Sequence, residues 1–470
     1  MHKTLILVAM LADAQHPVFA NDNDSFIPEV WAQEGLLLLE NNLVAAQLVH
    51  RDFEDEIASF GDTVNTRLPA TFTAQFKTDA DNVTIQDAIS PNVPVVLNRH
   101  VHTSFLIKDG EESKGFKLLR QTHLIPAMLS IAESVDQIVL GQVYEFLPNA
   151  VGQLGVTPTK ETVLAVREKM NSLKIPMGQR QLILGSETES DLLAIELFTS
   201  AEKVGDGGTA LEMGSLGRKY GLSTWMAQQT PSVPTGSTVA AYAVNNALGY
   251  AAGSTVITID GLVAAITAGS WVVIAGDNYP HRILSTVGGA TPTSMTLDTG
   301  LKRAVVDNAV VTVYTPGAVN FAAGYAAGYG KALVVDAFTT AIFGGQGVSI
   351  SPATPNGLEA VYAAYGTPTT TALTLNRPLD AAAADNQIVA PAPAGNYNFA
   401  FHPNALALVT RPLAQPDPET GARSFVANFN GLAMRVTVTY NGEKQGHLVT
   451  CDLLMGVKVL DVRLGVPMLA

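Results

Sequence analysis

The sequence predicts an α+β protein that carries an inserted all-β domain, and three observations lead to this prediction. Apolar residues recur at helical spacing in residues 27–56 and 124–147, whereas residues 62–112 alternate polar and apolar residues as antiparallel strands do. Helices and strands mix in residues 151–236 without the regular alternation of βαβ units. Residues 237–395 are dense in Ala, Gly, Thr and Val, poor in charge, and internally repeated.

Length and composition limit the classes of protein to consider. A chain of 470 residues is expected to form two or three domains. Hydrophobic residues make up 47% and charged residues only 15%, which indicates a surface that is largely buried against partners. The single cysteine, Cys451, excludes a disulfide framework and reads as a buried strand thiol. We count no run of about 20 apolar residues and therefore expect no membrane span.

The N-terminus, MHKTLILVAMLADAQHPVFANDND, has the layout of a secretory signal. Lys3 gives a basic start, Leu5 to Ala12 form an apolar run, and Val18-Phe19-Ala20 ends like a cleavage site. Asp13, however, closes the apolar run after eight residues, which is short for such a signal. We expect instead a retained arm over residues 1–25, covered by its own domain or by a neighbouring subunit.

The first half of the chain is expected to hold two helices and a long β arm. Pro28 opens the helix at 27–56, and the helix at 124–147 has the clearest apolar face. Residues 62–112 carry too few large apolar residues for a core of their own, so this hairpin is expected to pack on something else. Further elements are a helix at Glu161–Leu173, a buried strand at Arg180–Gly185, a helix at Asp191–Ala201, and a turn into a strand within Gly208–Pro231.

Residues 396–470 again mix helical and strand patterns, as the part of the chain before residue 237 does. NFAFHPNALALVTRPL is interpreted as an apolar strand that runs into a helix. Met434, Val436, Val438 and Tyr440 are expected on one face of a strand, with Arg435, Thr437 and Thr439 on the other. Asn441-Gly442 predicts a hairpin turn. The β-rich segment 237–395 is thus an insertion into a domain that resumes at Asn396.

The inserted segment contains two copies of one β unit. GYAAGSTVITIDG at Gly249 recurs as GYAAGYGKALVVDA at Gly324, and Asp307 has its counterpart at Asp385. The offset between the copies drifts from 75 to 78 residues along them, which indicates small insertions. Because two copies are too few for a solenoid, we expect a paired sandwich or barrel.

We find no strong match to a catalytic, metal-binding or phosphate-binding motif in the sequence. His100 and His102 share one face of a strand without a third ligand of suitable spacing, and the acidic run Asp52–Glu56 reads as a solvated helix end. AGYAAGYGKAL resembles a phosphate-binding loop, but Tyr325 stands at a required glycine and Ala332 at the Ser/Thr position. Gly214, Gly217 and Gly221 are expected in tight turns. We therefore predict no catalytic, cofactor-binding or metal-binding residues and no enzyme.

The order of elements resembles the major capsid protein of tailed bacteriophages, the HK-ninety-seven-type fold, in its short-tailed branch with an inserted β domain. FIPEVWAQEGLLLLENNLVAAQLVHRDFEDE and FGDTVNTRLP look like the N-terminal arm and the start of the extended loop, and RQLILG and GHLVTCDLLMGVKVLDVRLGVPML look like the central domain. The resemblance implies an N-terminal arm and helix (1–60), an extended β loop (61–115), a spine helix region (116–150), the first part of a central domain (151–236), an inserted duplicated β domain (237–395), and the second part with C-terminal strands (396–470).

The function that this resemblance implies is a structural subunit. It would self-assemble as pentamers and hexamers into an icosahedral shell around double-stranded DNA, with scaffolding, portal and decoration proteins as partners and no membrane. Assembly would take place in the host cytoplasm and the final location would be the virion. A secreted β-rich binding or surface-layer protein is the alternative from another class, because of the signal-like start and the Thr/Ala/Gly-rich repeats.

The net negative charge of the chain favours a shell that encloses DNA without binding it tightly. Acidic residues outnumber basic ones by 14, and no basic cluster is longer than Gly217-Arg218-Lys219 or Leu301-Lys302-Arg303. We expect the basic residues to pair with acids such as Glu54, Asp55 and Glu56 at subunit contacts. The inner surface is then expected to be neutral or acidic.

Overall fold

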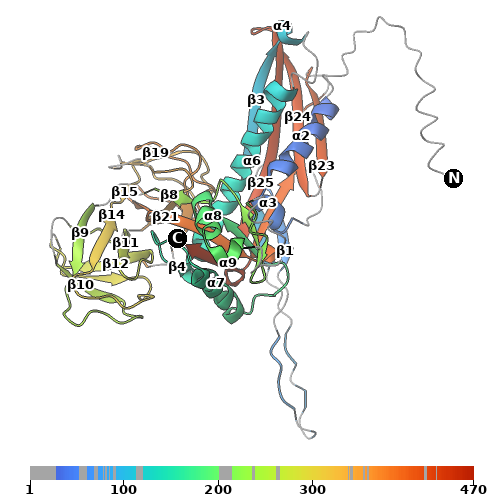
Figure 1. Ribbon diagram of the computed structural model, residues 1–470. Coiled ribbons are helices and arrows are strands. Elements are labelled where there is room, and N and C mark those ends of the chain that lie inside the picture. Colours follow the sequence, from blue (N-terminus) through green and yellow to red (C-terminus); the bar gives the residue numbers. More distant parts are fainter. Residues whose placement is uncertain are drawn as a thin grey trace, which may run out of the picture.

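The computed structural model describes residues 28–51, 61–67, 72–77, 79, 82–83, 85–87, 92–112, 120–200, 214–234, 239–260, 265–289, 291–336, 338, 342–352, 355–356, 359–417, 421–429 and 431–470. The arm expected at residues 1–25 and the acidic run Asp52–Glu56 lie outside these residues. Helices and sheets mix as an α+β fold. An elongated lobe, a central sheet with helices, and a β-rich lobe are arranged around a shared centre (Figure 1).

The elongated lobe is built on an antiparallel sheet with β25 (Gly446–Val459) in its middle. β3 (Arg99–Lys108) pairs with one edge of β25, and β24 (Leu432–Asn441) and β22 (Leu406–Arg411) pair with the other. β23 (Arg423–Phe429) lies beside β24. The strand at 99–108, expected within the extended loop, belongs to this sheet because all ten of its residues are in register with β25.

The helix expected at 27–56 is broken in the structure. α2 spans Pro28–Asn42 and α3 spans Ala45–Leu48, and His50 bridges to Ala407. The break has an electrostatic cause, because the Asp136 carboxylate accepts hydrogen bonds from the backbone N–H of Val44 at 2.8 Å and of Ala46 at 3.1 Å. A carboxylate at these otherwise unpartnered N–H groups starts a new helix.

The long central helix confirms the clearest sequence prediction. The π turn η2 (Arg120–Leu124) leads into α6 (Ile125–Leu140), which continues as the 3₁₀-helix η3 (Gly141–Asn149). By length and composition, Thr122–Asn149 is apolar enough to cross a membrane, which corrects the expectation that no stretch is. Of its apolar window, 61% is buried inside the fold, as in the core helix of a soluble protein, so this is weak evidence for a membrane span.

The central sheet has the order β4-β26-β21-β5-β7-β6. Its strands are β4 (Val151–Gly152), β5 (Gln181–Leu184), β6 (Arg218–Lys219), β7 (Leu222–Met226), β21 (Gly395–Phe401) and β26 (Gly465–Leu469). The helix expected at Glu161–Leu173 is α7 (Lys160–Ser172), and the turn before β7 is confirmed. The helix expected at Asp191–Ala201 is instead two short ones, α8 (Ser186–Leu193) and α9 (Glu196–Thr199).

The prediction of a helix after the strand at 396–401 is wrong. The chain makes a single 3₁₀ turn, η4 (Pro403–Ala405), and continues as the fully buried strand β22. The pairing of all six β22 residues with β25 overrides the helical preference of its Ala and Leu residues. The expected hairpin after β24 is confirmed, with Asn441 opposite Gly446 and a four-residue loop between them. Met434, Val436 and Val438 are buried as predicted, but Tyr440 is exposed.

A projecting hairpin leaves the body of the molecule beside α3. β1 (Thr63–Arg67) pairs with β2 (Asn92–Val96), and the described residues between the two strands extend away from all other elements (Figure 1). The side chain of Gln86 joins the two sides through the backbone of Thr73, with its Oε1 accepting from the N–H at 2.9 Å. The hairpin therefore has local hydrogen bonds, and none of the described residues between β1 and β2 is buried.

The β-rich lobe lies between β8 (Ser232–Val233) and β21, which pair with each other where the chain leaves and rejoins the central sheet. β9 (Val239–Val244), β10 (Val256–Asp260), β11 (Trp271–Ile274), β12 (His281–Val287), β13 (Ser294–Leu297) and β14 (Val310–Tyr314) close into a barrel. A second unit follows with β15 (Gly317–Ala318), β16 (Leu333–Val334), β17 (Gly347–Ser351), β18 (Val361–Ala363), β19 (Ala372–Leu373) and β20 (Ile388–Pro391).

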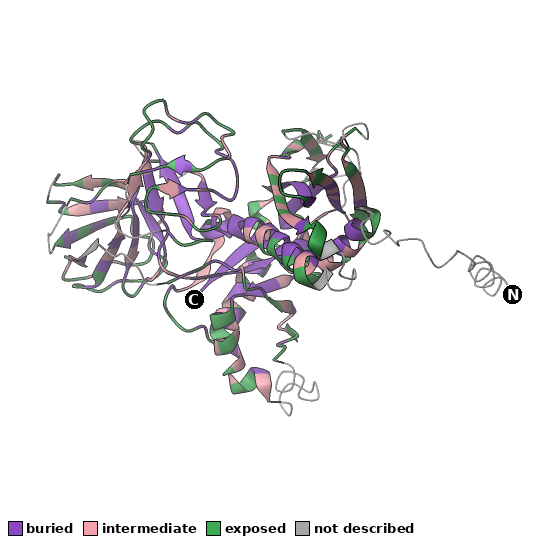
Figure 2. Cartoon of the chain, turned by 90° about the horizontal axis from the view of Figure 1, so that it is seen from above, coloured by how far each residue is buried: buried purple, intermediate pink, exposed green. Residues whose placement is uncertain are grey.

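Each unit has its own apolar cluster, and a larger cluster joins all the lobes. Ile257, Ile274 and Met295 belong to the barrel cluster, and Leu333 and Val348 to that of the second unit. The large cluster follows α2, α6 and η3 and includes residues from both β units. Figure 2 shows buried residues concentrated where the lobes meet and exposed ones toward their outer ends. The remaining short elements are α4 (Asp109–Glu112) and η6 (Val462–Leu464).

We predict that Asp136 controls how α2 and α3 are held on α6. Asp136→Ala leaves the partly buried N–H of Val44 and the buried N–H of Ala46 without this acceptor, so the free energy of unfolding should fall by about 2–4 kcal/mol in urea titrations. Glu133→Ala, an exposed change on the same helix, serves as the matched control. Equal stability of the two variants would contradict this role for Asp136.

A pH dependence follows from the same group. Burial raises the pKa of Asp136 to about 6, although the backbone N–H groups of Val44, Ala46 and Ala45 oppose part of the rise. Because the folded pKa exceeds the unfolded one, the protonated form stabilises the fold at low pH and this contribution is lost as pH rises through about 6. Asp136→Asn should remove about 2 kcal/mol of the stability change between pH 4 and pH 7. Identical pH profiles of both proteins would show that Asp136 does not titrate in this way.

Candidate functional site

The residues that the sequence singled out do not gather into one site. His100 and His102 lie on β3 with ring centroids 5.9 Å apart, and His100 Nε2 is 3.7 Å from Asp452 Oδ2. Among the described residues, no group of three or more His, Cys, Asp or Glu side chains is arranged to hold a metal ion. Burial raises the pKa of the Cys451 thiol to about 12, with Asp452 adding to the rise, so that thiol stays protonated. None of these arrangements points to catalysis.

The predicted turns and the loop that resembles a phosphate-binding loop have structural roles. Gly214, Gly217 and Gly221 all have positive φ, as expected for tight turns. The segment around Tyr325 forms turns and an isolated bridge to Ala383, and then enters the strand β16. A phosphate-binding loop needs a following helix whose N-terminal N–H groups face the phosphate, and here a strand follows.

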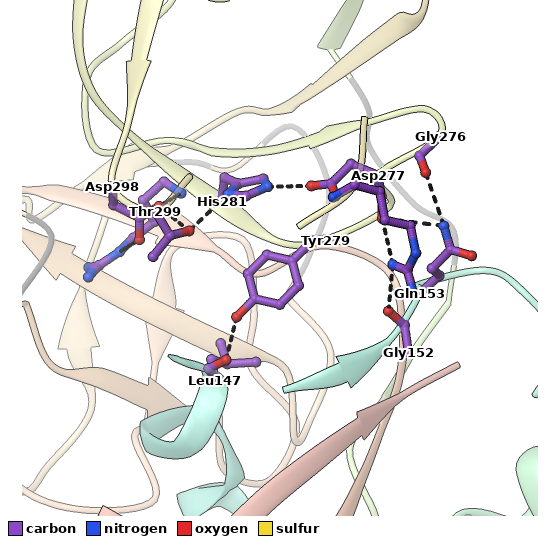
Figure 3. A network of polar contacts seen from close by, with 11 residues as sticks. Leu147, Gly152, Gln153, Gly276, Asp277, Tyr279, His281, Asp298 and Thr299 are labelled. Atoms are coloured by element: carbon purple, nitrogen blue, oxygen red, sulfur yellow. Dashed lines mark hydrogen bonds and ion pairs between the residues drawn. The ribbon is translucent and has the colours of Figure 1, made fainter. Parts of the chain in front are cut away.

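The most elaborate polar network joins the barrel to the central helix, and the sequence did not predict it. Asp277 Oδ2 lies 2.6 Å from His281 Nε2, and His281 Nδ1 lies 2.9 Å from Thr299 Oγ1 (Figure 3). Asp277 Oδ1 also accepts a hydrogen bond from the backbone N–H of Arg303 at 2.6 Å. Asp277 and His281 are completely buried, so every polar atom of this pair depends on a protein partner.

This order of carboxylate, imidazole and hydroxyl is also that of a nucleophilic triad, and two observations argue against that role. The imidazole and the Asp277 carboxylate are sealed from solvent. Asp298 Oδ1 lies 3.3 Å from Thr299 Oγ1, where a carboxylate would oppose the negative charge that develops in acyl transfer. The network is therefore suited to holding the barrel rather than to chemistry.

Several contacts extend this network onto the body of the protein. Tyr279 donates its hydroxyl to the carbonyl of Leu147 in η3 (Figure 3). The Leu154 N–H donates to Asn278 O at 2.9 Å. Gln153 Nε2 donates to Gly276 O at 3.1 Å, and Arg303 Nη1 donates to Gly152 O at 3.2 Å. The barrel is thus fixed to η3 and β4 along one continuous seam.

The second β unit has its own polar joint to η3. Arg377 Nη2 lies 2.8 Å from Glu145 Oε1, and Arg282 Nη1 of the barrel lies 2.8 Å from Glu359 Oε2 of the second unit. Burial raises the pKa of Glu145, while Arg377 and Lys458 oppose the rise. These partly buried ion pairs meet around a cavity of about 390 Å³ where both β units and η3 converge. They fix orientation, because removing one partner leaves a buried charge.

The projecting hairpin between β1 and β2 exposes large apolar side chains to solvent. Phe72, Phe76, Val83 and Ile85 are all more than half exposed, and Phe76 is fully so. No described element of the same chain covers them (Figure 1). Burying one such side chain is worth about 1.5–3 kcal/mol, so contact with another molecule would be strongly favoured.

We predict that Asp277 anchors the barrel. Asp277→Ala removes the acceptor of His281 and of the Arg303 N–H, at a local cost of about 3–5 kcal/mol. Amide hydrogen exchange in residues 239–314 should accelerate, whereas the exposed change Asp260→Ala should leave it unaltered. Unchanged protection of the barrel in the Asp277 variant would rule out this anchoring role.

The chain is similar in fold to solved structures of other proteins. No family model and no curated protein match the chain. The capsid structure of cyanophage P-SCSP1u is 9% identical, with a TM-score of 0.43 over 91% of this chain and 88% of that one. A structure from Mycobacterium phage Che8 is 11% identical, with a TM-score of 0.41 over 91% and 90%. The mature capsid of bacteriophage PhiM1 is 8% identical, with a TM-score of 0.35 over 90% and 86%.

These solved structures come from bacteriophages, and those of P-SCSP1u and PhiM1 are capsid structures. All three likenesses lie under 25% identity and under a TM-score of 0.5. The chain is similar to phage capsid structures along about nine-tenths of its length.

Proposed function

We propose that the chain is the major capsid protein of a tailed bacteriophage, a structural subunit that self-assembles into an icosahedral shell around double-stranded DNA. The observation that carries the proposal is the projecting hairpin with its exposed Phe72, Phe76, Val83 and Ile85. An apolar hairpin without a core requires a neighbouring molecule, and a lattice of identical subunits supplies one at every position.

The arrangement of elements supports the same proposal. A helix at the N-terminal side, a projecting β hairpin, a long central helix and a central α+β part follow one another in the order that the resemblance implies. The proposed N-terminal strap (1–25) would add a second contact between neighbouring copies. Scaffolding, portal and decoration proteins are proposed partners, with assembly in the host cytoplasm and the virion as the final location.

The domain division proposed from the sequence also has support. The chain leaves the central sheet at β8 and rejoins it at β21, which pairs with β8, and this pairing supports the proposed insertion over residues 237–395. Matching contacts support a duplication within it: Asp307 accepts from the Asn246 N–H at 2.9 Å, and Asp385 accepts from the Phe321 N–H at 3.0 Å. Asn308 and Asn386, the residues that follow these two Asp, both have a φ of 60°.

The first experiment tests the hairpin. Phe76→Ser combined with Ile85→Ser removes exposed apolar surface without touching the subunit core, so the melting temperature of the unassembled chain should stay within about 2 °C of wild type. Shell or hexamer formation, scored by negative-stain electron microscopy, should be lost. Leu248→Ser is the matched control, because Leu248 is 96% exposed on the barrel and lies away from the hairpin.

Two outcomes would count against the proposal. Double-variant shells with wild-type yield and heat resistance would show that the hairpin is not an assembly contact. Flat two-dimensional arrays formed by a chain with a processed N-terminus would favour the alternative, a secreted surface-layer protein.

The second experiment tests how the chain treats DNA. With 28 basic against 42 acidic residues, the chain should repel phosphate, so duplex DNA should bind the unassembled subunit more weakly than about 10 μM at 50 mM salt. Fluorescence anisotropy with a labelled duplex measures this directly. A sub-micromolar affinity for the duplex that falls steeply with added salt would contradict the proposal that the shell encloses DNA without binding it tightly.

A further inference from the structure

A groove of about 930 Å³ lies where the elongated lobe meets the second β unit, and its lining is unusual for this chain. The chain has an excess of 14 acidic residues, yet no Asp or Glu is among the described residues that line the groove. The lining combines basic side chains with hydroxyl groups and aromatic rings, among them Arg99, His100, His102, Ser134, Tyr329 and Lys331.

The groove follows the outer edge of β3. β25 pairs with β3 on one side and with β24 and β22 on the other, so β3 is a border strand of the sheet. Within the described part of the chain, no strand pairs with the outer edge of β3. Successive residues from Arg99 to Thr103 line the groove, and alternate residues of a strand point to opposite faces. The groove therefore includes the edge itself, where backbone N–H and C=O groups point outward.

Arg99 joins the two walls of the groove, and no Asp or Glu is among the described residues that line it. Arg99 Nε donates to Asn376 O at 2.9 Å and its Nη1 donates to Gly330 O at 3.0 Å, which ties the loop bearing Lys331 to β3. Asp452, the partner of His100 at 3.7 Å, is already bound by Arg435 through Nε at 3.0 Å and Nη2 at 2.8 Å. His102 and Lys331 are exposed.

We propose that this groove binds an extended acidic segment of a partner polypeptide by strand addition to β3. The partner backbone would pair with the outer edge of β3, and its carboxylates would contact Lys331 and His102. A peptide fits better than nucleic acid, because a strand edge presents backbone donors and acceptors at peptide spacing. The groove forms within one copy, so the proposal does not depend on shell assembly.

Binding is measured by fluorescence anisotropy on the full-length unassembled chain with labelled eight-residue probes. A peptide alternating Glu and Thr should bind, and one alternating Lys and Thr should not. Methylating alternate backbone nitrogens on the Glu-Thr peptide blocks one hydrogen-bonding edge, and should abolish binding if the peptide adds as a strand. A single-stranded pentanucleotide without terminal phosphates has four phosphodiester charges, which match the four Glu side chains, and it distinguishes a general polyanion site.

Variants locate the binding to the groove. Lys331→Glu combined with His102→Glu should weaken the acidic peptide at least about tenfold, whereas Lys444→Glu, a charge reversal in the exposed β24–β25 turn, should not. The proposal is overturned if the Glu-Thr peptide shows no binding at millimolar concentration. It is equally overturned if N-methylation or the double variant leaves the affinity unchanged, or if the pentanucleotide binds as tightly as the peptide.

Discussion

The fold depends on one buried helical rod, α6 with its 3₁₀ extension η3, to which every lobe is attached. Asp136 on this rod holds the start of α3, and the apolar face of α6 packs against β3 and α2. Leu147 accepts the hydroxyl of Tyr279 from the barrel, and Glu145 pairs with Arg377 of the second β unit. Because the rod is close-packed, its geometry fixes the relative placement of all the lobes.

The second β unit comes close to the rod at Gly141, where α6 gives way to the 3₁₀-helix η3. A Cβ at this position would lie 2.7 Å from Ala363 Cβ and 2.8 Å from Asn376 Nδ2, so only glycine lets the second β unit sit against the helix. The same Asn376 accepts the Ala363 N–H at 2.9 Å, and its backbone carbonyl receives Arg99 from β3. One crowded contact thus joins the rod, the β insertion and the elongated lobe.

Sequence reasoning succeeded where local periodicity decides the structure. The apolar spacing from Met128 to Val139 predicted α6, and the alternation from Met434 to Val438 predicted β24, because both patterns reflect burial on one face. It failed where distant residues decide: the break between α2 and α3 depends on a carboxylate 92 residues away, and β22 is a strand because β25 pairs with it. The Asp277–His281 joint was missed because its partners lie at a distance in the sequence: Thr299 is 18 residues from His281, and Arg303 is 26 residues from Asp277.

The central claim is that the projecting hairpin contacts a neighbouring copy, and site-directed photo-crosslinking tests it most directly. Cys451 is the only cysteine and is buried, so Phe76→Cys offers a single reactive position for a benzophenone label at the fully exposed hairpin site. After irradiation of the assembled protein, we predict covalent dimers and higher multimers whose linked peptides come from two copies of the chain. Crosslinks confined to one copy, or no crosslinks in assembled material, would contradict the account.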